Sequence, residues 1–257
     1  MEHFFMKKII TIKILLALSI ATSIIFKAGQ AQAQSGTILI DDFSLDQQVK
    51  AATPLQFERN VTASPSTFRA SRVFEIRSAT SPASDNLRAA LKRRQNSGGI
   101  IQAEAPISAG NSFILWSDQT INNFNLSDPN NLGTEPFLAN SSFNAASCQG
   151  VELSGISFDA PGGANTTEPQ AFFEITLYDR SNREGSKFNR AQVGLNRRFN
   201  NETIRVALSE FNANGPAGEA NLANIGAISL GILTNNAAVV KAKDISISDI
   251  KFYGCSN

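Results

Sequence analysis

Apolar and polar side chains alternate with a period of two along much of this chain. Phe173, Ile175 and Leu177 share one parity, while Glu174 and Thr176 take the other. This alternation is typical of strands that bury one face. Short runs of this kind, or of strand-forming residues between turn residues, lie at 37–43, 72–77, 100–103, 112–116, 151–159, 173–177, 204–208, 228–232 and 245–252. They predict an all-β fold, an antiparallel two-sheet β-sandwich.

Two of these runs change phase. In 151–159 the apolar parity switches across Ser154 and Gly155, and in the last run of the chain it switches across Ser248 and Asp249. One extra residue in a strand has this effect, so we expect a β-bulge at both places. Bulges bend strands, as a curved sandwich requires.

Two stretches give weaker patterns. Residues 44–70 are expected to be loop-rich, because Pro54 and Pro65 discourage regular pairing. Residues 84–95 fit a short helix or a strand, and we favour a strand that turns at 95–99 into the next one.

The first 33 residues have the pattern of a secretion signal. Lys7 and Lys8 precede an apolar run at 14–26, and the sequence at 31–33 is Ala-Gln-Ala, which fits a cleavage site before Gln34. A retained anchor is the alternative, but a spanning helix needs about 20 apolar residues. We therefore expect residues 34–257 to form one domain, secreted to the periplasm or the extracellular space, with no membrane span after cleavage.

The two cysteines, Cys148 and Cys255, fit an oxidising compartment that permits a disulfide. Two free buried thiols are the alternative. A bridge between them would tie the C-terminal end of the domain to the middle of the chain.

Composition excludes several kinds of chemistry. The one histidine, His3, lies in the signal, so the mature domain holds no Ser-His-Asp triad and no imidazole ligand for zinc or haem. The chain has 23 Lys+Arg against 22 Asp+Glu, and this balance argues against nucleic acid as a partner.

Three fragments together, at 38–43 (Ile-Leu-Ile-Asp-Asp-Phe), 221–228 and 244–250, resemble secreted jelly-roll sandwiches of the galactose-binding-like and carbohydrate-binding-module type. The resemblance implies that the first and last strands pair and that sugar binding is the common activity. It also implies a structural calcium near those strands, for which Asp41, Asp42 and Asp249 would supply oxygen ligands.

Candidate ligand residues lie where strands meet loops. Trp116 with Asp118, and Tyr178 with Arg180, combine an aromatic ring with hydrogen-bonding groups, as sugar binding requires. The alternative for Trp116 is a core anchor, and for Tyr178 a half-exposed edge residue.

Glu152 and Glu174 are the candidate catalytic carboxylates. On neighbouring strands they could serve as the acid and base of glycoside hydrolysis. The alternative is that both are solvated residues on an outer face.

These observations favour a non-catalytic binding or adhesion module for an extracellular polysaccharide or a cell-surface glycan. One alternative is a structural envelope or matrix protein without a small ligand. Another is a carboxylate-based glycan hydrolase or lyase.

Overall fold

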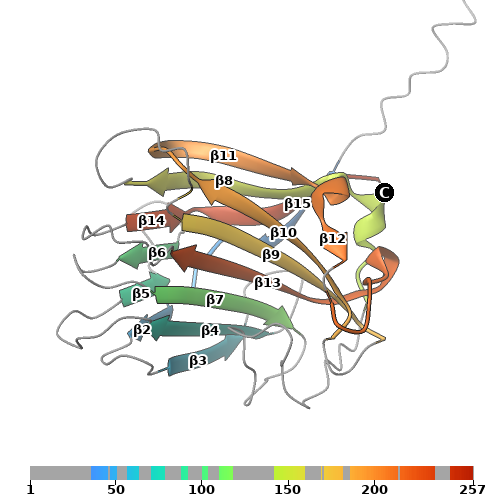
Figure 1. Cartoon of the computed structure of the whole chain (residues 1–257), viewed down its shortest axis with the longest axis horizontal. Helices are drawn as coiled ribbons and strands as arrows, with labels where there is room; N and C mark the ends of the chain where they lie inside the picture. Colours follow the sequence, from blue (N-terminus) through green and yellow to red (C-terminus); the bar gives the residue numbers. More distant parts are fainter. Residues whose placement is uncertain are drawn as a thin grey trace, which may run out of the picture. The chain divides into compact units, whose positions relative to one another are not determined.

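The structure is a computed structural model, and two antiparallel β-sheets account for most of what it describes (Figure 1). Residues Gly36–Cys255 form one compact unit, and residues 1–35 and 256–257 fall outside it. The described residues are 36–45, 47–50, 57–63, 71–78, 88–91, 100–103, 110–117, 142–159, 169, 171–181, 186–213, 215–234 and 244–256. The expected signal at 1–33 and the expected turn at 95–99 lie outside these residues.

One sheet has eight described strands. Its order is β1 (Gly36–Asp41), β15 (Asp249–Cys255), β8 (Gly150–Phe158), β14 (Asp244–Ile247), β6 (Ile100–Ala103), β5 (Arg88–Leu91) and β2 (Gln47–Lys50), and β11 (Phe199–Ala207) also pairs with β8. β14 and β15 follow one another along the same edge of β8, and β1 pairs antiparallel with β15. The expected pairing of the first and last strands is therefore confirmed.

The other sheet has seven described strands. Its order is β12 (Asn212–Ala213), β10 (Phe188–Leu195), β9 (Ala171–Asp179), β13 (Ile225–Thr234), β7 (Gly110–Ser117), β4 (Ser71–Ser78) and β3 (Phe57–Ala63). Three short 3₁₀ helices lie between described strands: η1 (Ala145–Ser147), η2 (Leu208–Glu210) and η3 (Leu222–Asn224). In the described part of the chain, no helix is long and apolar enough to cross a membrane.

The strand order confirms the jelly-roll. Between β7 and β14 the chain repeatedly crosses from one sheet to the other, which places β1–β15–β8–β11 opposite β7–β13–β9–β10. These two sets of four are the eight strands of a jelly-roll built from two Greek keys. The strands β2 to β6 are inserted between its first and second strands and widen both sheets.

Two of the inserted strands, β2 and β3, occupy part of the 44–70 stretch that we expected to be loop-rich. Each stands at the end of the strand order given for its sheet. The strand expected within 84–95 is β5, which pairs antiparallel with β6.

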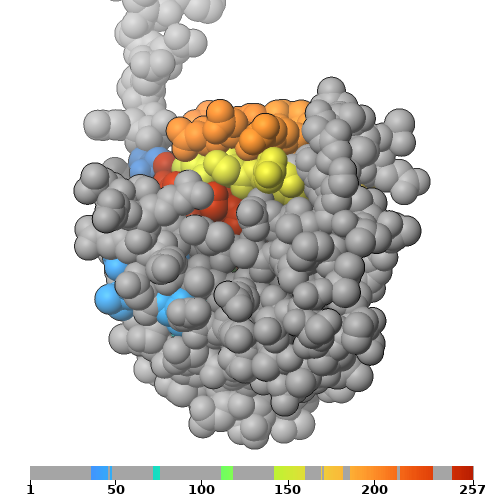
Figure 2. Space-filling model, turned by 90° about the vertical axis from the view of Figure 1, so that its left-hand side faces the viewer, coloured from blue at the N-terminus to red at the C-terminus, as the bar shows by residue number. Residues whose placement is uncertain are grey.

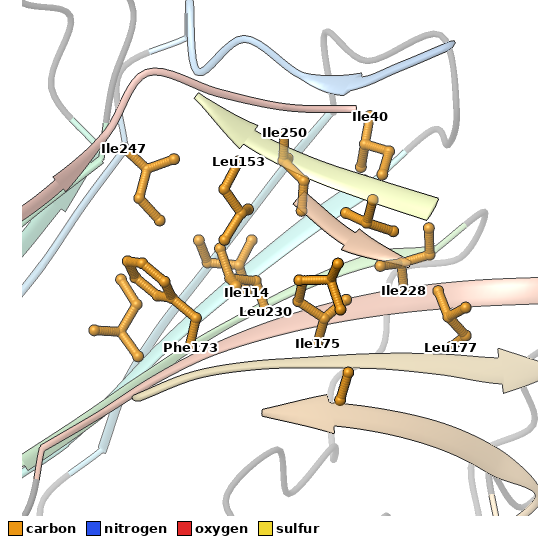
Figure 3. Packing of buried hydrophobic residues seen from close by; sticks show 14 of the residues in the cluster. Ile40, Ile114, Leu153, Phe173, Ile175, Leu177, Ile228, Leu230, Ile247 and Ile250 are labelled. Atoms are coloured by element: carbon orange, nitrogen blue, oxygen red, sulfur yellow. The ribbon is translucent and has the colours of Figure 1, made fainter. Parts of the chain in front are cut away.

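The core forms where the apolar parities of the two sheets meet. Leu153 and Ile250 from one sheet point toward Phe173, Ile175 and Leu230 from the other, and all five are fully buried (Figure 3). This arrangement is what the period of two predicts, because alternate side chains of a strand leave the sheet on opposite faces.

The bulge expected in β8 is present, because the register of β8 with β11 shifts between Leu153 and Ile156. The second phase change, at Ser248 and Asp249, lies opposite it but is not accompanied by a shift in register. Gly155 has a φ of +63°, and a Cβ there would approach Ser248 Oγ to 2.0 Å. Ser246 pairs with Ser157 and Asp249 with Ser154, so β8 keeps a constant register with β14 and β15. The buried apolar parity switches on both sides of this pairing, from Leu153 to Ile156 on β8 and from Ile247 to Ile250 opposite it, and the pairing continues across the switch.

Candidate functional site

The seven-stranded sheet is buried over much of both faces. On the face turned away from the partner sheet, six residues form a second apolar cluster: Val73, Phe113, Leu115, Tyr178, Phe188 and Ala227. The uninterrupted apolar run at 113–116 is the sequence signal for such a doubly buried strand. We expected each sheet to bury one face and expose the other, whereas this sheet buries apolar residues on both faces.

One end of that outer face is accessible. β9 and β10 pair so that Phe172 lies opposite Gly194, and Glu174 opposite Gln192. Phe172 is half-buried and Gln192 is exposed, while Arg190 retains part of its surface. We call Phe172, Glu174, Arg190 and Gln192 the β9–β10 face.

The polar groups of the β9–β10 face centre on Glu174. Gln192 Nε2 donates to Glu174 Oε2 at 2.6 Å, and Arg190 Nη1 lies 3.5 Å from the same oxygen. The Arg190 guanidinium also lies over the Phe188 ring, 4.9 Å from its centroid. The face thus brings a carboxylate, an amide and a guanidinium together beside an aromatic ring.

Gly231 of β13 lies opposite Glu174 on the side away from β10. A Cβ at Gly231 would meet the Phe113 ring at 3.2 Å, so the strand carries no side chain between Glu174 and that ring. Glycine inside a strand often marks a place of close approach by a ligand or another backbone.

The outer face of the eight-stranded sheet carries a different carboxylate environment. Arg205 Nε donates to Glu152 Oε2 at 2.6 Å, and Lys251 Nζ lies 2.9 Å from Glu152 Oε1, which also accepts from Ser154 Oγ. Burial alone would raise the pKa of Glu152, but the bonds from Lys251 and Arg205 outweigh it, and the pKa lies below its ordinary value. This carboxylate is saturated by its own strands, β11, β8 and β15, which lie side by side in Figure 2.

Glu152 and Glu174 therefore do not form the catalytic pair considered from the sequence. Glu152 lies on β8 and Glu174 on β9, which belong to opposite sheets, and each points away from the shared core. The sequence showed that both alternate with core residues, but it did not show that their strands face each other across the sandwich.

Trp116 is a core residue rather than an exposed platform. It is fully buried, and its Nε1 donates to Asp41 Oδ2 at 2.6 Å. The inward parity of β7 places the ring against Phe43, with 6.2 Å between ring centroids. The ligand role expected for Trp116 is therefore replaced by the core-anchor alternative, and Asp118 lies outside the described residues.

Tyr178 lies on the outer face, as its parity indicates, but it is buried. Its hydroxyl is 3.3 Å from Ser229 Oγ, and burial raises its pKa to about 12. Arg180 follows at the end of β9, where its N–H donates to the Asn224 carbonyl. Both stand at the end of β9 far from Phe172, so neither belongs to the β9–β10 face.

Asp179 organises the loops at that end of β9. Its carboxylate accepts from the N–H and the hydroxyl of Ser181, each at 2.7 Å, and from the N–H of Asn221 at 2.9 Å. Burial acts to raise the pKa of Asp179, but these donors prevail and hold the pKa below its ordinary value.

This lowered pKa gives a testable pH dependence. The stabilisation by Asp179 is present above its ordinary pKa of 3.8 and is lost as the pH falls through the lower folded value. In urea denaturation, we expect Asp179→Asn to have a lower free energy of unfolding than the wild type at pH 7. This difference should become smaller as the pH is lowered to 2. A difference that stays constant across this range would contradict the assignment.

Asp41, one of the three residues expected to bind calcium, is already paired with an arginine. Asp41 Oδ2 is 2.8 Å from the buried guanidinium of Arg72, and its Oδ1 accepts from the Phe43 N–H at 2.7 Å. A cation already neutralises this carboxylate, so Asp41 does not fit a calcium ligand. Among the described residues no group of three acidic, histidine or cysteine side chains could hold a metal. Calcium binding by Asp42 and Asp249 stays a prediction.

Sequence reasoning missed Phe172, Arg190 and Gln192. Phe172 shares the outer parity of Glu174, so its face could have been recognised from the alternation of β9. The positions of Arg190 and Gln192 depend on the register between β9 and β10, which the connecting loop sets and the alternation does not.

No family model and no curated protein matches this chain. Among solved structures, the chain is similar to the family 11 carbohydrate-binding module of the cellulosomal cellulase Lic26A-Cel5E of Clostridium thermocellum, with 12% identity and a TM-score of 0.35 over 86% of this chain and 95% of that one. It is also similar to a DUF4465 family protein from Bacteroides caccae, with 9% identity and a TM-score of 0.32 over 84% and 98%.

Proposed function

We propose that this chain is an exported, non-catalytic carbohydrate-binding module, and that the β9–β10 face holds the sugar. The observation that carries the proposal is the set of groups on that face. Phe172 offers an aromatic surface, and Glu174, Arg190 and Gln192 offer both donors and acceptors beside it. Sugars present apolar C–H patches next to hydroxyls that donate and accept, so this combination suits them.

The spacing of the carboxylates supports a role without catalysis. Glu75 is the other described carboxylate side chain on the outer face of this sheet, and β13 and β7 separate its strand from β9. Three strand spacings of about 4.8 Å place the two backbones about 14 Å apart, whereas glycoside hydrolysis needs carboxyl groups about 5–9.5 Å apart.

The disulfide supports the proposed export. Cys148 and Cys255 are bonded, which removes the alternative of two free thiols. Disulfides of this structural kind persist in oxidising compartments outside the cytoplasm. We place the protein in the periplasm or the extracellular space, where polysaccharides and cell-surface glycans are its proposed partners.

Retention on polysaccharide tests the proposal. We expect Phe172→Ala to weaken retention in affinity electrophoresis about tenfold or more, because the apolar surface that contacts the sugar ring is lost. Tyr253→Ala is the matched control, since Tyr253 is a half-buried aromatic residue on the outer face of the opposite sheet, beside Arg205. Equal retention of the two variants would contradict the proposed site.

A further inference from the structure

The β9–β10 face also carries information about the kind of glycan. We propose that it selects neutral over acidic glycans, with Arg190 and Glu174 together binding a pair of neighbouring ring hydroxyls. This inference rests on the proposed function and adds to it a substrate class and the residues that determine it.

The first support is the charge of the face. Arg190 is the cationic member of the β9–β10 face, and Glu174 lies 3.5 Å from it. A glycan carboxylate that reached Arg190 would therefore also meet Glu174, and like charges at such range repel. A hydroxyl is neutral, so Glu174 does not repel it.

The second support is unused hydrogen-bonding capacity. Arg190 Nε is a buried nitrogen without a hydrogen-bond partner, and the Arg190–Glu174 contact is long and involves Oε2 alone. The hydrogen bond from Gln192 and the contact with Arg190 both involve Glu174 Oε2, and neither involves Oε1. Glu152 of the opposite sheet differs from Glu174, because Arg205 contacts one of its oxygens and Lys251 contacts the other. Glu152 is therefore the example of a carboxylate with a structural role.

The two groups complement a hydroxyl pair and not a carboxylate. A guanidinium only donates and a carboxylate only accepts, whereas a hydroxyl does both. One sugar hydroxyl can accept from Arg190 while its neighbour donates to Glu174. A ligand carboxylate can only accept, so it would leave Glu174 without a new donor.

The test compares neutral and acidic polysaccharides on the purified protein. The probes are mixed-linkage β-glucan, xylan and galactan against polygalacturonate and alginate, at low salt and at about 0.5 M NaCl, where surface charges are screened. We expect retention on at least one neutral probe, unchanged by salt and exceeding retention on either acidic probe. Glu174→Gln keeps the side-chain shape and should weaken neutral retention about tenfold.

The matched control is Arg205→Gln, on the outer face of the opposite sheet, which should leave retention unchanged. Stronger, salt-sensitive retention on an acidic probe would overturn the neutral selectivity and leave the proposed carbohydrate function standing. If Glu174→Gln were retained as strongly as the wild type, the proposed role of this carboxylate would be overturned, but the neutral selectivity would not. No retention on any of the five probes would overturn both proposals.

Discussion

Replacing Asp41 by alanine is expected to lower the free energy of unfolding by about 3–5 kcal/mol, the usual cost of breaking a buried ion pair on one side. Asp41 and Arg72 are both fully buried, and Asp41 also accepts from Trp116 and from the Phe43 N–H. Removing the carboxylate leaves the Arg72 guanidinium charged inside the sandwich. Urea denaturation followed by tryptophan fluorescence measures the change, because Trp116 reports on this site.

The next residue provides the matched control. Asp42 is exposed and accepts from the Ser44 N–H, two residues along the chain, so Asp42→Ala should change stability by about 0.5 kcal/mol or less. A second variant separates charge from volume. Replacing both Asp41 and Arg72 by apolar residues should recover part of the loss, because no unpaired charge remains. Equal effects of Asp41→Ala and Asp42→Ala would contradict the buried pair.

Removing the disulfide is expected to have the second large effect. Cys148 and Cys255 are 107 residues apart, and a closed loop of that size stabilises a fold by about 4–5 kcal/mol in the chain-entropy model. The bridge ties the end of β15 to η1, and β15 pairs with both β1 and β8. We therefore expect the Cys148→Ser/Cys255→Ser variant to unfold at a much lower urea concentration than the oxidised wild type.

Reductant provides the control for this variant. It should lower the denaturation midpoint of the wild type toward that of the double variant and leave the double variant unchanged. A wild-type midpoint that does not respond to full reduction would show that the bridge contributes little to stability.

The fold could be predicted from the sequence because strand alternation is a local property. The phase change at Ser154–Gly155 located a bulge of β8 against β11, since an extra residue moves the apolar side chains to the other parity. The pairing of the first and last strands was predicted from the resemblance to jelly-roll sandwiches, which rests partly on residues 38–43 and 244–250.

The candidate site could not be predicted in the same way, because it depends on which strands become neighbours. Glu174 and Gln192 meet only through the register of β9 with β10. Asp41 reaches Arg72 and Trp116 from the opposite sheet, at a register shift of β1 between Leu39 and Asp41 that alternation does not reveal. The same shift explains why a residue expected to bind calcium lies instead in the core.

The most direct test of the proposed site is a titration of the ¹⁵N-labelled protein with a neutral oligosaccharide cut from whichever probe retains it, followed by amide chemical shifts. We predict that the largest changes fall at 172–176 and 190–194, on the two strands of the β9–β10 face. Largest changes on β8, β11 and β15 instead would place the sugar on the opposite sheet and contradict the account.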